Sequence, residues 1–208
     1  DAGVDGTGGV VQDEQLRGRP AGQILGRERE LGLLTAWWQQ AAEGRGQVVG
    51  IVGEAGVGKT RLLQEFQRTL NPGSRVWIGL ACSSTGRDTP YSLVAQLLRQ
   101  IFGILPGDGD EAAAAKIEQG LAALPGSPHA SDPKINQILR ETLGLSTSDV
   151  AEDERKVRRG RLVNLLRTMM ANVAQQQPLI IAVDDLHWVD DASLDLLGQV
   201  TDGIHRLG

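Results

Sequence analysis

An α/β fold built around a parallel sheet is predicted by three features of the sequence. Short, almost purely apolar runs at residues 47–52, 75–81 and 179–183 have the character of strands buried on both faces. Segments with apolar residues at three- and four-residue steps, the period of a helix, lie between these runs. Because strands that alternate with helices form a parallel sheet covered on both faces, we expect three layers.

The first apolar run leads into an octapeptide, GEAGVGKT, which is followed by a helix-like segment. Between a strand and a helix, the pattern GxxxxGK[ST] is a phosphate-binding loop rather than a glycine turn that matches by coincidence. Glycines let backbone N–H groups approach phosphate oxygens, and the helix start adds the positive end of its dipole. We expect the ammonium of Lys59 at the β/γ-phosphates and the hydroxyl of Thr60 on Mg²⁺. The nucleotide-binding residues of this stretch are Gly53, Glu54, Ala55, Gly56, Val57, Gly58, Lys59, Thr60 and Arg61.

Seven helices are predicted from the apolar periodicity and from the glycine and proline residues that stop it. Their approximate ranges are 24–43, 59–70, 91–104, 110–124, 134–143, 152–176 and 191–207. In the sixth of these helices we expect Val157 on the buried side, and in the last we expect Leu194 there. Residues 1–23 are rich in glycine and lack an apolar period, so we expect a linker or the tail of a preceding domain.

A pair of carboxylates, Asp184 and Asp185, follows the last apolar run. The carboxyl ends of parallel strands form the edge of the sheet where ligands bind. Asp184 is therefore expected to hold Mg²⁺ beside Thr60, and Asp185 is placed where a general base could polarise a water molecule. An exposed acidic turn is the alternative, but the phosphate-binding loop and the acidic pair each predict the other.

Composition narrows the class of protein. No apolar run approaches the ~20 residues that cross a bilayer, and no secretory signal is present, so we expect a soluble, cytoplasmic protein without a membrane partner. Net charge is −5 without a basic stripe, which argues against a nucleic-acid surface. Cys82 is the only cysteine, which fits a reducing compartment and predicts a small buried side chain.

Three ordered motifs carry a resemblance to a known family. They are GRERE at 26–30, the loop and helix start at 53–63, and DDLHWVD at 184–190 followed by ASLDLL at 192–197. Together they resemble the AAA-type signal-transduction ATPases of the STAND class. The module next to class III adenylate/guanylate cyclase domains is similar, as is the one in large LuxR-type transcription regulators. The resemblance identifies residues 24–208 as the N-terminal part of an AAA-type ATPase domain, with 106–150 as a helical insertion.

The resemblance also implies a role for each matching residue. The nucleotide base would lie near Ile24, Leu25, Gly26 and Arg27. Lys59 would act at the phosphates, Asp184 on Mg²⁺ and Asp185 as the catalytic base. Many relatives have Glu at this last position; because Asp is one methylene shorter, slow or switch-like hydrolysis is implied. His187 and Trp188 belong to the family motif, and both packing and sensing roles stay open for them.

In this family a further strand lies between the acid-bearing strand and the phosphate-loop strand, and a sensor, an arginine-bearing helix and a lid follow it. The sequence begins with Asp1 rather than Met and ends at Gly208 before these parts. We therefore expect a piece of a longer protein, with an incomplete, three-stranded sheet of the P-loop NTPase type. ATP hydrolysis by this piece alone is not expected.

Several functions remain as hypotheses. The first is an ATP/ADP-binding switch that regulates an attached output domain such as a nucleotide cyclase, with nucleotide-dependent oligomerisation. The second is the ATPase module of a LuxR-type regulator with a DNA-binding output, and the third is a P-loop small-molecule kinase, although no arginine-rich lid is evident. A non-catalytic interaction module is the last, and the intact Lys59, Thr60 and Asp184 argue against it.

Overall fold

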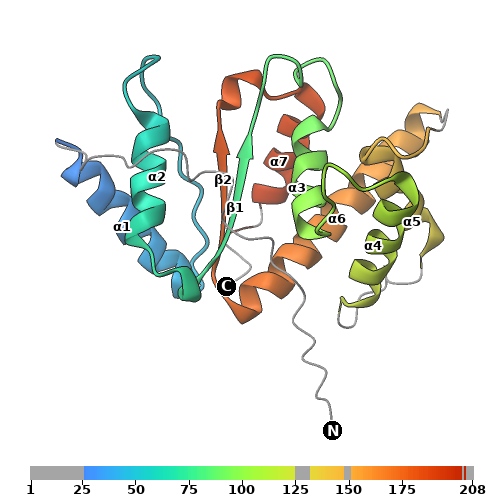
Figure 1. The fold of residues 1–208 in the computed structure, drawn as a ribbon, viewed down its shortest axis with the longest axis horizontal. Coiled ribbons are helices and arrows are strands. Elements are labelled where there is room, and N and C mark those ends of the chain that lie inside the picture. Colours follow the sequence, from blue (N-terminus) through green and yellow to red (C-terminus); the bar gives the residue numbers. More distant parts are fainter. Residues whose placement is uncertain (1–25, 125–131, 148–150, 203, 205–208) are drawn as a thin grey trace, which may run out of the picture.

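The computed structural model describes residues 26–124, 132–147, 151–202 and 204, in which helices surround a short parallel sheet (Figure 1). The helices are α1 (Glu28–Ala42), α2 (Lys59–Thr69), α3 (Ser92–Ile101), α4 (Asp110–Ala122), α5 (Pro133–Thr142), α6 (Glu152–Gln176) and α7 (Asp191–Thr201). The strands are β1 (Val76–Ala81) and β2 (Leu179–Asp184), and two single 3₁₀ turns are η1 (Pro72–Ser74) and η2 (Leu186–Trp188). The α/β class and all seven predicted helices are confirmed.

The two strands pair in parallel, in a register that runs from Val76 opposite Leu179 to Ala81 opposite Asp184. The chain between them passes through α3, α4, α5 and α6 before it returns to the sheet. Because parallel strands end at the same edge, the residues that follow Ala81 and Asp184 are brought together there. Cys82 donates its backbone N–H to the Asp184 carbonyl at 3.0 Å, which extends the pairing to that edge.

Helices cover both faces of the sheet, which gives the three predicted layers (Figure 1). Side chains alternate between the faces of a strand. Trp77 and Ile180, which lie opposite each other in the ladder, pack with α1 and α2. Their neighbours Ile78 and Ile181 pack on the other face with α3, α6 and α7. The helices α4 and α5 lie beyond this second layer, on the side of the molecule away from α2 (Figure 1).

The strand predicted at residues 47–52 is not shown by the structure, in which this stretch is neither helix nor strand. Among the described residues the sheet has two strands rather than three. A strand is defined by backbone hydrogen bonds to a neighbour, and 47–52 joins no ladder in this part of the chain. Ile51 packs against the small cluster on α1 and α2, whereas the side chain of Val52 is 96% exposed.

Two predicted core positions are also wrong. Val157 is 56% exposed near the start of α6, and Leu194 is 49% exposed on α7. The buried side of α7 consists instead of Ser193, Leu196 and Val200. Leu194 is rotated away from this buried face by one residue: Ser193 lies on the same side of α7 as Leu196 and Val200, and its hydroxyl accepts the N–H of Val94.

The predicted linker at residues 1–23 lies outside the described residues. Among the residues that are described, no helix is both long and apolar enough to cross a membrane.

Candidate functional site

The glycine-rich loop joins residues 47–52 to the first turn of α2. Gly56 and Gly58 have φ angles of 77° and 93°, in the left-handed region where a side chain is disfavoured. Gly58 is the N-cap of α2, so no side chain caps the first N–H groups of that helix. At Gly53 a Cβ would lie 3.0 Å from the Cγ1 of Val57, a tight contact that the Val57 side chain would have to relieve. The loop thus presents backbone donors and a helix start to the same space, an arrangement suited to an anion.

Lys59 folds back over this loop. Its Nζ donates to the carbonyl oxygens of Gly53 and Glu54, each at 3.0 Å. An ammonium has three donors, so these two bonds orient the charge along the loop and leave one N–H for a ligand. The contacts hold the positive charge of Lys59 against the carbonyl groups of its own loop.

Arg27 connects the start of α1 with the same loop. Its Nη2 donates to the Val57 carbonyl at 3.0 Å, and its Nη1 pairs with Glu30 at 2.8 Å. The hydrogen bond from Arg27 lowers the pKa of the Glu30 carboxyl, which keeps this pair charged. Of the residues predicted near the nucleotide base, Gly26 and Arg27 are described and lie at the start of α1; Ile24 and Leu25 lie outside the described residues.

The two predicted halves of the site meet. Thr60, in the first turn of α2, donates its hydroxyl to Oδ2 of Asp184 at 2.7 Å. The two residues are separated by 124 positions and come from different elements, so only the fold brings them together. Asp184 is the last residue of β2, and its second oxygen, Oδ1, accepts the N–H of Asp185 at 2.9 Å. A hydroxyl and a carboxylate in contact form an oxygen donor pair of the kind that Mg²⁺ prefers.

Asp185 begins a turn that leaves the sheet. Its φ and ψ are 53° and 39°, a left-handed conformation that is uncommon outside glycine. The side chain is 57% exposed, and the Nδ1 of His187 lies 3.9 Å from its Oδ1. The rings of His187 and Trp188 are in contact, with centroids 5.0 Å apart. Asp185 is therefore open to solvent at the edge where Thr60 and Asp184 meet.

Asp190 was not singled out from the sequence, yet it is among the most connected side chains near this edge. It is the N-cap of α7 and accepts the N–H of Ser193 at 2.8 Å. An Asp just before a helix-like segment, as at position 190, is a common N-cap, so the sequence could have predicted this cap. Asp190 also binds the start of α3 nearly a hundred residues earlier, and no local signal predicts that contact.

Cys82 is buried, as predicted. Burial raises the pKa of its thiol, and the nearby carboxylates of Asp190, Asp185 and Asp184 raise it further. The thiol therefore stays protonated at neutral pH, which disfavours a role as nucleophile.

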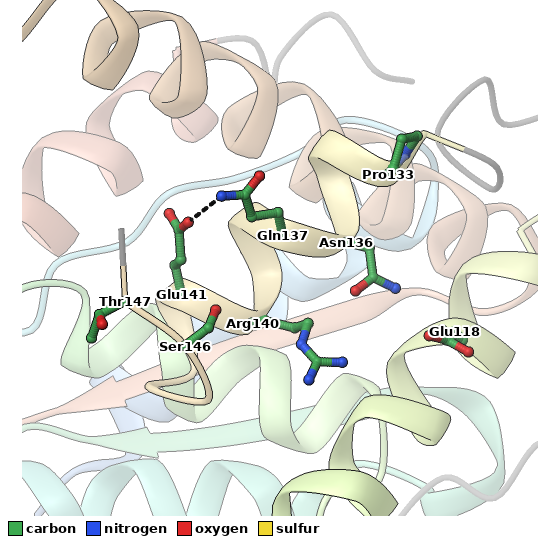
Figure 2. Close-up of a pocket in the computed structure, with 8 residues that line it drawn as sticks. All are labelled: Glu118, Pro133, Asn136, Gln137, Arg140, Glu141, Ser146 and Thr147. Atoms are coloured by element: carbon green, nitrogen blue, oxygen red, sulfur yellow. Dashed lines mark hydrogen bonds between the residues drawn. The ribbon is translucent and has the colours of Figure 1, made fainter. Parts of the chain in front are cut away.

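A hollow of about 420 Å³ lies elsewhere, between α4 and α5 (Figure 2). Its wall is polar and includes Asn136, Gln137 and Arg140 of α5, and Gln137 donates to Glu141 at 2.9 Å. None of the predicted site residues lines it. The candidate site is located by the chemistry of the loop and of the Thr60–Asp184 contact, and it does not depend on this hollow.

A protein-family model and a bacterial protein sequence match this chain. A family model described as "AAA ATPase domain" matches residues 23–205. In Rhizobium meliloti (strain 1021), the protein named "Uncharacterized protein R02095" is 34% identical over 185 residues, which make up 88% of this chain and 17% of that protein. The chain thus spans less than a fifth of the length of this relative. No solved structure matches the chain.

Proposed function

We infer that this chain, which belongs to the AAA ATPase domain family, binds ATP with Mg²⁺ at the edge formed by the glycine-rich loop and the end of β2. The observation that carries the inference is the 2.7 Å contact between Thr60 and Asp184. It joins the glycine-rich loop to the acidic pair that follows β2, the two motifs expected to form one site.

The loop would bind the phosphates. Backbone N–H groups at the start of α2, which no side chain caps, can donate to phosphate oxygens. Lys59 adds a positive charge on the same side of the loop. The charge of Lys59, the dipole of α2 and the backbone hydrogen bonds therefore all favour a polyphosphate over an uncharged ligand.

Thr60 and Asp184 would hold Mg²⁺. Their contact brings a hydroxyl and a carboxylate oxygen together, which makes the pair suitable as ligands of this ion. The ion would neutralise part of the phosphate charge when it is bound. A site with one carboxylate and one hydroxyl matches the way Mg²⁺ binds beside nucleotides, since the ion keeps several waters and takes other ligands from phosphate.

Asp185 is the proposed general base, because it is exposed and adjoins the metal-binding residue. Asp185→Asn should leave Mg·ATP affinity intact and slow ATP hydrolysis in the parent protein. Single-turnover hydrolysis with radiolabelled ATP measures the difference. Equal rates in the two proteins would remove Asp185 from this role.

The wider role rests on the family resemblance. We propose a STAND-class switch in which residues 24–208 are part of the ATPase domain, 1–23 a linker and 106–150 a helical insertion. The output would be an attached domain such as a nucleotide cyclase, or a DNA-binding domain as in LuxR-type regulators, with nucleotide-dependent oligomerisation in the cytoplasm. In this proposal Arg27 serves the nucleotide-base end of the site together with Ile24, Leu25 and Gly26.

Lys59→Ala tests ATP binding. Loss of the ammonium should reduce Mg·ATP affinity by about tenfold or more, because a charge-assisted hydrogen bond contributes about 1.5–3 kcal/mol. Calorimetric titration and ATP-dependent melting measure the effect. Lys134→Ala, which changes a lysine on α5, is the matched control and should bind as the unmodified chain does. Unchanged affinity in Lys59→Ala would contradict the proposed function.

A further inference from the structure

A buried carboxylate lies between the starts of two helices. Asp190 is only 2% exposed. Its Oδ1 accepts the backbone N–H of Ser193 in α7 and that of Tyr91, at the N-cap of α3, both at 2.8 Å. Its Oδ2 accepts the hydroxyl of Ser92 at 3.0 Å. Burial alone would raise the pKa of this carboxyl, but these hydrogen bonds outweigh it and hold the pKa below its ordinary value.

The start of α3 depends on these bonds. Its N-cap residue, Tyr91, has φ of 62° and no side-chain capping bond of its own. The first N–H groups of a helix need partners outside it. Here they come from α7: Asp190 accepts from Tyr91, and the hydroxyl of Ser193, which is fully buried, accepts from the N–H of Val94 at 3.4 Å. We call Asp190, Ser193 and their partners on α3 the helix clamp.

The helix clamp closes one end of the turn at residues 185–189. Inside this turn Trp188 donates its N–H to the Asp185 carbonyl at 2.9 Å, and Val189 donates to Leu186 at 3.1 Å. The other end of the turn is the last residue of β2. Asp185, Leu186 and His187 are exposed, whereas Trp188 and Val189 are partly buried and pack against the cluster on the α3, α6 and α7 face, so the turn is held both by its fixed ends and by these two side chains.

The shape of this turn reaches the candidate site through one hydrogen bond. At the start of the turn the N–H of Asp185 donates to Oδ1 of Asp184, whose Oδ2 accepts from Thr60. A change in the turn would release the first of these bonds. The carboxylate of Asp184 would lose the contact that orients it.

We propose that Asp190 is a positioning residue: by tying the starts of α3 and α7 together, it holds the 185–189 turn so that the Asp184 carboxylate is oriented toward Thr60. This inference rests on the proposed function for its consequence at the nucleotide. The dependence of the 185–189 turn on the helix clamp does not rest on the proposed function, because it is argued from the hydrogen bonds of Asp190.

Asp190→Asn and Asp190→Ala separate the effect of the clamp from a general loss of stability. Asn has the same shape, an oxygen for both N–H groups and an amide that can donate to the Ser92 hydroxyl. Ala removes every bond. The probe is ¹⁹F NMR of the chain labelled with 5-fluorotryptophan, since Trp188 lies in the turn, while Trp37 and Trp38 lie on α1 and Trp77 lies on β1. Trp188→Phe assigns the resonance.

In the free protein, Asp190→Ala should shift or broaden the Trp188 resonance and leave those of Trp37 and Trp38 in place, and Asp190→Asn should restore the native position. An unmoved Trp188 resonance in a folded Asp190→Ala protein would overturn the proposal, and so would equal disturbance by Asn and Ala. If Asp190→Ala does not fold, Ser92→Ala removes one bond only. It should move Trp188 by a smaller amount, and no movement there would overturn the proposal.

Affinity for ATP tests the consequence at the site. With EDTA, Asp190→Ala should bind ATP as the unmodified chain does, because the phosphate-binding loop is untouched. With Mg²⁺, the gain in affinity should fall about tenfold, the lower end of what loss of a group orienting a metal ligand costs. An undiminished Mg²⁺-dependent gain would overturn the link to Asp184. If the unmodified chain binds no ATP, the proposed function fails, while the ¹⁹F result still decides whether the clamp holds the turn.

Discussion

The two faces of the sheet are packed in different ways. On the face of α3, α6 and α7, apolar side chains from both strands and from these helices form one continuous cluster that extends into α4 and α5. On the face of α1 and α2, the buried members in the described part of the chain are Leu34, Leu62, Phe66 and Leu70, which pack against Trp77 and Ile180. The elements that carry the glycine-rich loop therefore belong to the thinner layer.

Because of this difference, one face of the sheet contributes most of the stability and the other carries the candidate binding site. Burial of apolar area is the main favourable term in folding, so the larger cluster dominates the free energy of unfolding. The thinner layer is tied to the sheet by specific contacts: the Phe66 and Trp77 rings lie 6.2 Å apart, and Arg75 donates to the Gln67 carbonyl at 3.0 Å. A layer with few buried contacts opens at lower free energy. The glycine-rich loop thus lies where movement costs least.

The largest expected effect comes from the thick layer. Leu165 is completely buried in α6, and Leu165→Ala should lower the free energy of unfolding by about 3 kcal/mol through lost burial and a cavity. Urea unfolding measures it. Leu194→Ala, on the exposed side of α7, is the control and should stay within about 0.5 kcal/mol. ATP affinity of the folded Leu165→Ala protein should be unchanged; a matching loss of affinity would break the separation between the two layers.

Lowering the pH should have an intermediate effect on the free energy of unfolding, because the pKa of Asp190 lies below its ordinary value in the folded chain. The ionised carboxylate contributes stability above the ordinary carboxyl pKa of about 3.9, and this contribution is lost as the pH falls through the folded pKa. Burial raises the pKa of both Tyr91 and Cys82, so neither titrates in this range.

Urea unfolding of the unmodified chain and of Asp190→Asn at pH 7 and pH 3 measures this contribution. The unmodified chain should lose more stability between the two pH values than the neutral variant does. Equal losses would show that the helix clamp contributes nothing through its charge, and would leave apolar burial as the main source of stability in the thick layer.

The smallest effect is expected in the thin layer. Arg27→Gln removes the charged donor to the Val57 carbonyl, a partly exposed contact of about 0.5–1 kcal/mol, so Mg·ATP affinity should fall about two- to fivefold. Arg29→Gln, which changes an exposed arginine in the first turn of α1, is the matched control and should have no effect. Calorimetric titration distinguishes the two. A drop of stability without a drop of affinity would assign Arg27 to packing of α1.

Most helices and two strands could be predicted because their signals are local. Proline and glycine at positions 71–73 and 178 stop elements, and apolar periods define faces. The prediction was wrong where a contact between residues far apart in the sequence decides the local structure. Leu194 fits the apolar period, but Ser193 is turned inward by its bond to Val94. Residues 47–52 have strand composition, yet composition cannot supply a hydrogen-bonding neighbour.

The sequence by itself determined which residues form the glycine-rich loop, because the positive φ angles and the helix start follow from steric rules over a few residues. It also indicated the acidic pair at the end of a buried strand. Only the tertiary structure decided that Thr60 meets Asp184 and that Asp190 joins α3 to α7. These contacts join residues about a hundred positions apart, and their geometry depends on how the layers pack rather than on any local pattern.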